Sequence, residues 1–171
     1  MIRFAAVAAA LALMLPGMAL AQAPTDPQIA HIAYTAGQID IDAGKQALAK
    51  SQNKDVRAFA EVMVRDHTAV NEKALALVKK MNVTPADNPA SKALSDAARK
   101  ARDDQAKLSG AAFDRAYLEH EVAYHKTVNG ALKDTLIPNA KNAELKALLE
   151  TGLKLFQEHQ THAEHTLKAL R

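Results

Sequence analysis

The segment VRAFAEVMVRDHTAVNEKALALVKKM, residues 56–81, decides the fold. Its apolar residues recur at intervals of three and four, except for one seven-residue gap that His67 fills. This period is typical of an amphipathic helix that buries one face. The stripe consists of Val56, Ala60, Met63, Val70, Ala74, Leu77 and Met81. We therefore expect a helix here, with His67 on its buried face.

A second helix is expected just before this segment, over residues 27–50. Its stripe of apolar and small residues runs from Ile29 to Ala47, and Asp40 occupies the missing position. Only Ser51-Gln52-Asn53 separate the two helices. A link this short forces an antiparallel hairpin.

Downstream, residues 82–89 contain two prolines and two asparagines, which end the helix. Residues 91–107 read as a polar, alanine-rich helix, which we expect to be a crossover and not part of the core. A further helix begins after Ser109-Gly110 and ends near Pro138, and its aromatic stripe is core packing. The last helix covers about residues 141–170, with His159 on its apolar stripe.

Two hairpins joined by a long crossover give the connectivity of ferritin-like bundles. The sequence therefore predicts an all-α fold, a ferritin-like four-helix bundle with a short extra helix in the crossover. A chain of this length forms one domain, which we place at residues 27–171, after a tail at 22–26.

The first residues predict export. Met1 to Arg3 is a short basic start, Phe4 to Leu15 is an unbroken apolar run, and small residues follow it. This is the pattern of a secretory signal peptide. We expect cleavage after Ala21, with Ala23 as the alternative site, and a periplasmic product.

Composition narrows the function further. The chain has a net charge of +3 with both signs interspersed, which argues against binding nucleic acid. It has no cysteine, so a thiol nucleophile, a disulfide and a lipidated cysteine are all excluded. No second apolar segment follows the signal, so we expect no transmembrane segment after cleavage. An envelope protein or a second copy of the chain remains open as a partner.

Polar residues interrupt the apolar stripe of each long helix, and burying them is costly unless they are paired or bind a metal. They are Asp40, His67, Glu121 with His125, and His159. Helical rise from the turns places Glu121 and His159 within roughly 6 Å in height, and His125 about 12 Å from His159. Imidazole and carboxylate ligands suit zinc, iron, copper or manganese. The alternative is a buried hydrogen-bonded network that fixes helix register without a metal.

Two standard enzyme motifs are missing. His120 and His125 enclose one residue too many for a zinc-protease motif. No Asp or Glu has a histidine three residues later, so the carboxylate-bridged di-iron pattern is absent. His159, His162 and His165 near the C-terminus read as a solvated face, with a surface metal site as the weaker alternative. An enzyme is thus less favoured than a binding protein, and a redox enzyme would need a non-standard site.

Four short segments resemble those of a known family. They are FAEVMVRDH at 59–67, FDRAY at 113–117, EVAYH at 121–125 and FQEH at 156–159. Over about residues 26–170 the chain resembles the exported bacterial family called domain of unknown function 4142. The resemblance implies a ferritin-like bundle in which His67, His125 and His159 match the family's histidines. Asp40 stands where the family's glutamate is expected and is one methylene shorter.

These observations predict a periplasmic ferritin-like bundle that binds a transition metal through His67, His159, Glu121, His125 and Asp40. The competing interpretation is a metal-free structural, stress-protective or interaction protein of the cell envelope.

Overall fold

The computed structural model describes residues 23–170, and every regular element within them is helical, so the all-α prediction is confirmed. The predicted signal peptide, residues 1–21, and Gln22 of the tail lie outside the described residues. The elements are α1 (Asp26–Lys50), α2 (Lys54–Lys80), α3 (Pro89–Ala106), α4 (Gly110–Ala131), the π-helical turn η1 (Leu132–Leu136), α5 (Ile137–Asn139) and α6 (Ala143–Ala169).

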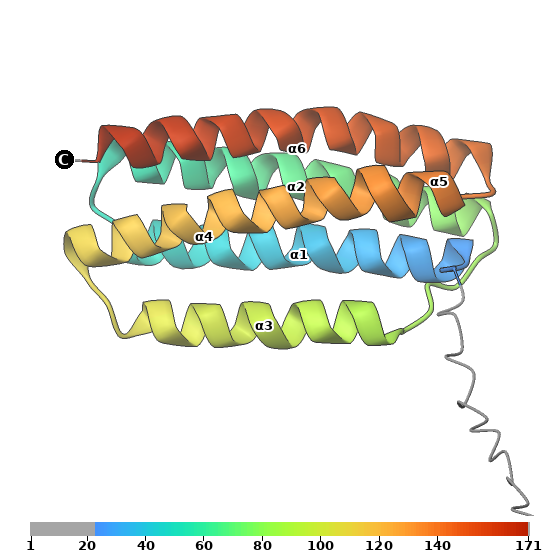
Figure 1. Ribbon diagram of the computed structural model, residues 1–171, viewed down its shortest axis with the longest axis horizontal. Coiled ribbons are helices and arrows are strands. Elements are labelled where there is room, and N and C mark those ends of the chain that lie inside the picture. The colour runs from blue at the N-terminus through green and yellow to red at the C-terminus, as the bar shows by residue number, and fades with distance from the viewer. Residues whose placement is uncertain (1–22, 171) are drawn as a thin grey trace, which may run out of the picture.

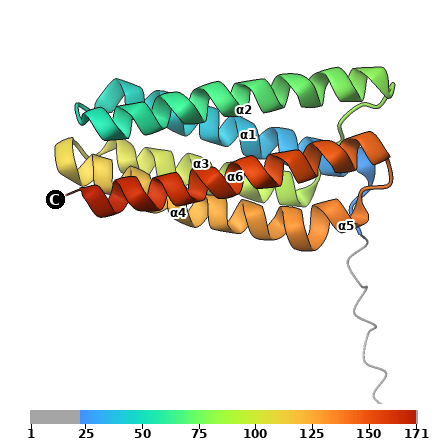
Figure 2. The ribbon, with the colours of Figure 1, turned by 90° about the horizontal axis from the view of Figure 1, so that it is seen from above.

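The four long helices α1, α2, α4 and α6 lie side by side, and α3 lies along α1 on the outside (Figure 1). Figure 2 shows the same packing from above. The α1–α2 and α4–α6 pairs are antiparallel hairpins, whereas α2 and α4 run in the same direction because α3 carries the chain back along the molecule. None of the described helices is long and apolar enough to cross a membrane.

Asparagine side chains start three of the helices. The Oδ1 atoms of Asn53, Asn88 and Asn142 accept hydrogen bonds from backbone N–H groups in the first turns of α2, α3 and α6. These contacts satisfy donors that a helix start otherwise leaves bare. At the other end of α2, Asn82 adopts a positive φ of 52° and stops the helix. Loop chemistry, rather than helix propensity, therefore fixes the hairpin turns.

The sequence suggested that the α4–α6 hairpin turns near Pro138, but the turn comes later in the chain. The helix passes into a π-helical turn over Leu132–Leu136, and the N–H of Ile137 donates to the carbonyl of Leu132, five residues back. Pro138 has no N–H to offer the carbonyl of Asp134, so a regular α-helical bond cannot form there. The chain stays helical to Asn139, and α6 begins only at Ala143.

The crossover helix is more than a surface connection, which corrects our expectation that it contributes nothing to the core. Ala98 is only 3% exposed and belongs to one of the two apolar clusters, with Leu94 packed against it. Two side chains of α1 also hold the C-terminal end of α3, because Gln46 donates to the carbonyl of Arg102 and Lys50 donates to that of Ala106.

The core has two apolar clusters with a polar layer between them. One contains Ile39, Tyr124 and Phe156, and the other contains Ala43, Met63, Leu118 and Ala163. On each long helix, the buried polar residue singled out from the sequence falls between the two clusters. The fold thus brings these residues to one level, where any ionisable group must find a partner or a ligand.

Candidate metal centre

The five predicted site residues are all buried in this polar layer. Asp40 comes from α1, His67 from α2, Glu121 and His125 from α4, and His159 from α6, and none is more than 3% exposed. Glu121 and His125 are one helical turn apart, so they share the face of α4 that points inward.

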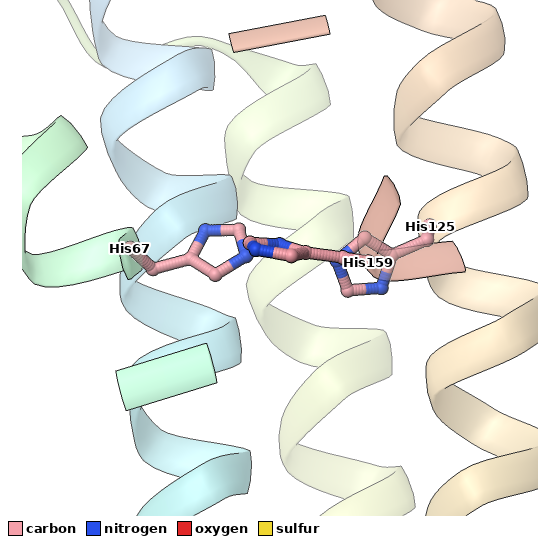
Figure 3. Close-up of side chains that lie close together, drawn as sticks. All are labelled: His67, His125 and His159. Carbon is pink, nitrogen blue, oxygen red and sulfur yellow. The ribbon is translucent and has the colours of Figure 1, made fainter. Parts of the chain in front are cut away.

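Three histidines form the centre of the layer. Figure 3 shows His67, His125 and His159 pointing toward one another from three helices. One ring nitrogen from each lies within 4.8 Å of the other two. The ring centroids are 5.1 to 5.7 Å apart. An ion bonded to three nitrogens at about 2.0–2.1 Å would hold them about 3.3 Å apart, so modest side-chain rotations would close the site.

Protein acceptors engage one nitrogen each of the His125 and His159 rings. His125 Nδ1 donates to the backbone carbonyl of Glu121 at 3.0 Å, and His159 Nε2 donates to Asp66 Oδ2 at 3.0 Å. His67 Nε2 lies 3.4 Å from Asp40 Oδ2. Such contacts fix the ring orientation and tautomer of metal-binding histidines. His125 Nε2, His159 Nδ1 and both nitrogens of His67 have no hydrogen-bond partner within the described residues.

A second, acidic group adjoins the histidines. Asp40, Glu121 and His125 each offer one atom within 4.8 Å of the others. The two carboxyls lie beside the three-histidine group. They form a less complete site of their own, because His125 Nδ1 already donates to a backbone carbonyl. Both oxygens of Glu121 and Oδ1 of Asp40 lack a hydrogen-bond partner among the described residues.

The electrostatics of the layer keep the histidines neutral at pH 7. Burial, reinforced by the neighbouring imidazoles, holds the pKa of His67 well below its usual value. Burial lowers the pKa of His125 to about 4 and also lowers that of His159, where the nearby Asp66 carboxylate partly opposes the shift. Neutral imidazole is the form that binds metal ions.

The pKa values of the two buried carboxyls are shifted upward. Burial, reinforced by the charge of the neighbouring Glu121 carboxyl, raises the pKa of Asp40 well above its usual value. Burial likewise raises the pKa of Glu121. The pair therefore retains a proton at neutral pH. An incoming cation would favour the ionised carboxylates and displace that proton.

The layer is chemically suited to a divalent transition metal. A hydrogen-bonded network without an ion should pair its buried polar atoms, because each one left alone costs about 1–3 kcal/mol. Here six nitrogen and carboxyl oxygen atoms have no partner within the described residues, in addition to His67 Nε2 beside Asp40. Three neutral nitrogens with carboxylates alongside match zinc, iron, copper or manganese.

The geometry settles the relative positions that the sequence left open. The height difference of about 12 Å predicted for His125 and His159 is wrong, because their ring centroids lie 5.6 Å apart. It assumed a turn at Pro138, whereas the turn lies near residue 141, so the two histidines are about 16 and 18 residues from it. At 1.5 Å rise per residue their heights differ by only about 3 Å.

Asp66 is the residue of this site that the sequence analysis missed. It precedes His67 on α2, and its side chain is 18% exposed, at the edge of the buried layer. It lies at the edge of the apolar face of α2, where the sequence pattern does not distinguish it from an exposed charged residue. The hydrogen bond from His159, which is 93 residues away in the chain, becomes visible only in three dimensions.

A serine, a histidine and an aspartate meet elsewhere, a contact that spacing did not predict. His31 Nδ1 lies 2.9 Å from Ser91 Oγ, and His31 Nε2 lies 2.8 Å from Asp87 Oδ1. However, Ser91 is only 3% exposed, and its hydroxyl donates to the carbonyl of Asn88. A nucleophile must be reachable by its substrate, so this contact reads as a tether that docks the start of α3 on α1.

The C-terminal histidines divide as the sequence suggested. His159 is buried in the polar layer, whereas His162 and His165 are exposed on α6. Within residues 23–170, neither belongs to a group of three residues placed to hold an ion. The favoured interpretation of a solvated face is therefore retained for these two.

Comparison with known proteins gives one finding. The family model described as Domain of unknown function (DUF4142) matches residues 14–166, which is most of the chain. No curated protein and no solved structure matches this chain.

Proposed function

We propose that this chain, which belongs to the family described as Domain of unknown function (DUF4142), is an exported ferritin-like four-helix bundle that binds one transition-metal ion in its core. The first-sphere ligands are one ring nitrogen each of His67, His125 and His159. The carboxyls of Glu121 and Asp40 lie alongside, where they supply negative charge or a fourth ligand. The observation that carries the proposal is the convergence of three buried histidine rings from three helices, with one nitrogen of each within 4.8 Å of the others.

The ferritin-like assignment rests on connectivity. The long helices form two hairpins, and the crossover that carries α3 makes α2 and α4 parallel, as in ferritin-like folds with one long connection. The ligand set differs from the standard carboxylate-bridged di-iron arrangement, because this chain contributes three histidines and no Glu-x-x-His pair. A single ion therefore fits the residues better than a carboxylate-bridged pair.

Export and a periplasmic location are part of the proposal and rest on residues 1–21. Cell fractionation with sequencing of the mature N-terminus tests them. A periplasmic chain that begins at Gln22 supports export with cleavage after Ala21, and a start at Pro24 supports cleavage after Ala23. A chain that retains Met1 in the cytoplasm removes the periplasmic assignment.

The metal proposal is tested by elemental analysis of the mature protein purified without a histidine tag. A His67→Ala, His159→Ala double variant removes two ligands. A matched His162→Ala, His165→Ala variant removes two exposed histidines of the same helical region. About one ion per chain is expected in the wild type and in the exposed variant, with loss from the core variant. Circular dichroism checks that the core variant remains helical, and His67→Gln provides a version that keeps more of the side-chain volume.

The second candidate is a metal-free envelope protein in which the polar layer only fixes helix register. It is favoured by the contacts that each imidazole already makes, to a backbone carbonyl, to Asp66 and near Asp40. The same experiment separates the two functions. If the purified protein contains no metal and takes up none of zinc, iron, copper or manganese, the metal proposal fails and the layer is structural.

A further inference from the structure

An apolar cavity lies beside the polar layer, between α1, α2, α4 and α6. Its volume is about 80 Å³. Its walls are almost entirely hydrocarbon and include Ala33, Ala74, Val78, Leu132, Leu149 and Gly152. It occupies the apolar cluster that contains Phe156, at the end of the bundle where the π-helical turn η1 forms part of the wall.

The chemistry of the walls defines the class of occupant. Water in such a space would find almost no hydrogen-bond partners, and apolar cavities stay dry and bind apolar atoms or small hydrocarbons instead. An ion or a strongly polar molecule would lose its hydration without replacement. The volume is about half that of an engineered 150 Å³ cavity that holds benzene or xenon. The occupant is therefore small, uncharged and apolar.

The cavity also contacts the candidate metal centre through one residue. Phe156 lines the cavity, and its ring stacks on His67 with centroids 4.6 Å apart and an interplanar angle of 15°. The same ring meets His125 edge-on at 6.4 Å. An occupant that presses on Phe156 changes the surroundings of both imidazoles.

From this continuity we propose that the cavity is a binding chamber for small uncharged apolar molecules, either a dissolved gas or a short hydrocarbon, and that Phe156 transmits occupancy to the His67 imidazole. The inference goes beyond metal binding, because the chamber consists of apolar side chains and does not need the ion. It gives the bundle a second ligand site in contact with the first.

The test uses metal-free protein, so its result is independent of the metal proposal. Methyl NMR spectra are recorded under increasing xenon pressure. Saturable shifts are expected for Leu149, Leu132 and Val78, which line the cavity, and not for Val56 or Leu118, which belong to the other apolar cluster. Side-chain nitrogen resonances of His67 should move with the same saturation curve. Shifts that rise linearly with pressure in both clusters would overturn the proposal.

Filled variants give the matched comparison. Ala33→Leu and Ala74→Leu place a larger side chain on the cavity wall, whereas Ala147→Leu makes the same change at an exposed position of α6. Xenon shifts should disappear in the first two and persist in the third. Should either leucine variant fail to fold, Gly152→Ala gives a milder filling, because an added Cβ would lie 3.4 Å from the Phe156 ring, in ordinary contact.

A second gas separates the two sources of ligand. Propane is added in place of xenon at matched activity. Saturation by both gases shows that the chamber accepts a short hydrocarbon, and saturation by xenon alone restricts its ligands to dissolved gases. Absence of saturable shifts with either gas removes the chamber, whatever the metal content of the protein.

Discussion

At the scale of single residues, the histidines differ from ordinary buried polar groups in how their nitrogens are used. The hydrogen bond from His159 to Asp66 fixes which nitrogen of that ring carries the proton. Asp66 is itself held by Arg65 on the surface, at 2.7 Å. Burial would raise the pKa of Asp66, but the hydrogen bonds from Arg65 and His159 outweigh it, so the pKa is lowered. Asp66 is therefore a charged carboxylate that orients His159, one of the ligands in the proposed metal site.

The first prediction follows from this contact. Asp66→Asn removes the charge and should weaken metal affinity by about 10- to 100-fold, as substitution of the residues behind metal ligands usually does. Competition titration against a chromophoric chelator measures the affinity. Glu72→Gln, an equally neutralising change at an exposed position of α2, is the control. Equal affinities in the two variants would show that Asp66 does not orient a ligand.

The second prediction concerns pH and the metal-free protein. Burial raises the pKa of Glu121 to about 8, whereas in the unfolded chain it ionises near pH 4. The folded state thus holds the proton more tightly, and this contribution to stability, complete below about pH 4, is lost as pH rises toward 8. Glu121→Gln carries no such proton. The variant should therefore become progressively more stable relative to the wild type between pH 4 and 8.

Urea unfolding at several pH values in the presence of a chelator measures this difference. The buried histidines act in the opposite direction in both proteins, because their lowered pKa values make the folded state lose stability as pH falls below about 6.5. Taking the difference between variant and wild type cancels the histidines and leaves the coupled carboxyls of Glu121 and Asp40. A difference that does not change with pH would mean that Glu121 is already ionised in the fold.

At the scale of elements, the helices could be predicted because their apolar periodicity is local information. The stripe of residues 56–81 required helix α2, and the short asparagine link required the hairpin. The level of His125 could not be read in the same way, because it depends on where α4 turns toward α6. The missing N–H of Pro138 looks like a stop signal, yet the chain absorbs it in a π-helical turn and continues. The contribution of Ala98 to the core likewise depends on how α3 docks, which periodicity does not encode.

The third prediction contrasts two helical glycines. At Gly44 of α1 an added Cβ would lie 2.8 Å from Val64 Cγ2 and 3.1 Å from the backbone carbonyl of Ala60. The glycine therefore permits the close approach of α1 and α2, and Gly44→Ala should lower the unfolding free energy by about 1–3 kcal/mol. Gly152→Ala meets only ordinary contact with Phe156 and removes a flexible residue from α6, so it should raise stability by about 0.5–1 kcal/mol.

Denaturant unfolding of both glycine variants at one pH checks the contrast. The comparison controls for the general preference of helices for alanine over glycine, because that preference is the same at the two positions. If Gly44→Ala proved as stabilising as Gly152→Ala, the two helices would have to be able to move apart without loss, and the tight α1–α2 contact would not be a constraint on the fold.

At the scale of the whole molecule, two apolar clusters on either side of one polar layer give separate sources of stability. Each cluster joins side chains from several long helices and does not include the site residues. The fold should therefore persist without a metal, with the layer as its weakest level. A bound ion adds stability because it binds only where the three histidines have been brought together, and the unfolded chain holds them 34 or more residues apart.

The fourth prediction concerns how much a bound ion stabilises the folded state. With free metal at about 1,000 times its dissociation constant, the folded state gains about 4 kcal/mol, which for a chain of this length raises the melting temperature by about 8–16 °C. Chelation should reverse the rise while helical circular dichroism at 25 °C stays unchanged, since the two clusters still pack. The His67→Ala, His159→Ala variant should show no rise. If chelation instead melted the helices, the ion would be a requirement for folding, and the two apolar clusters would be insufficient to hold the four helices together.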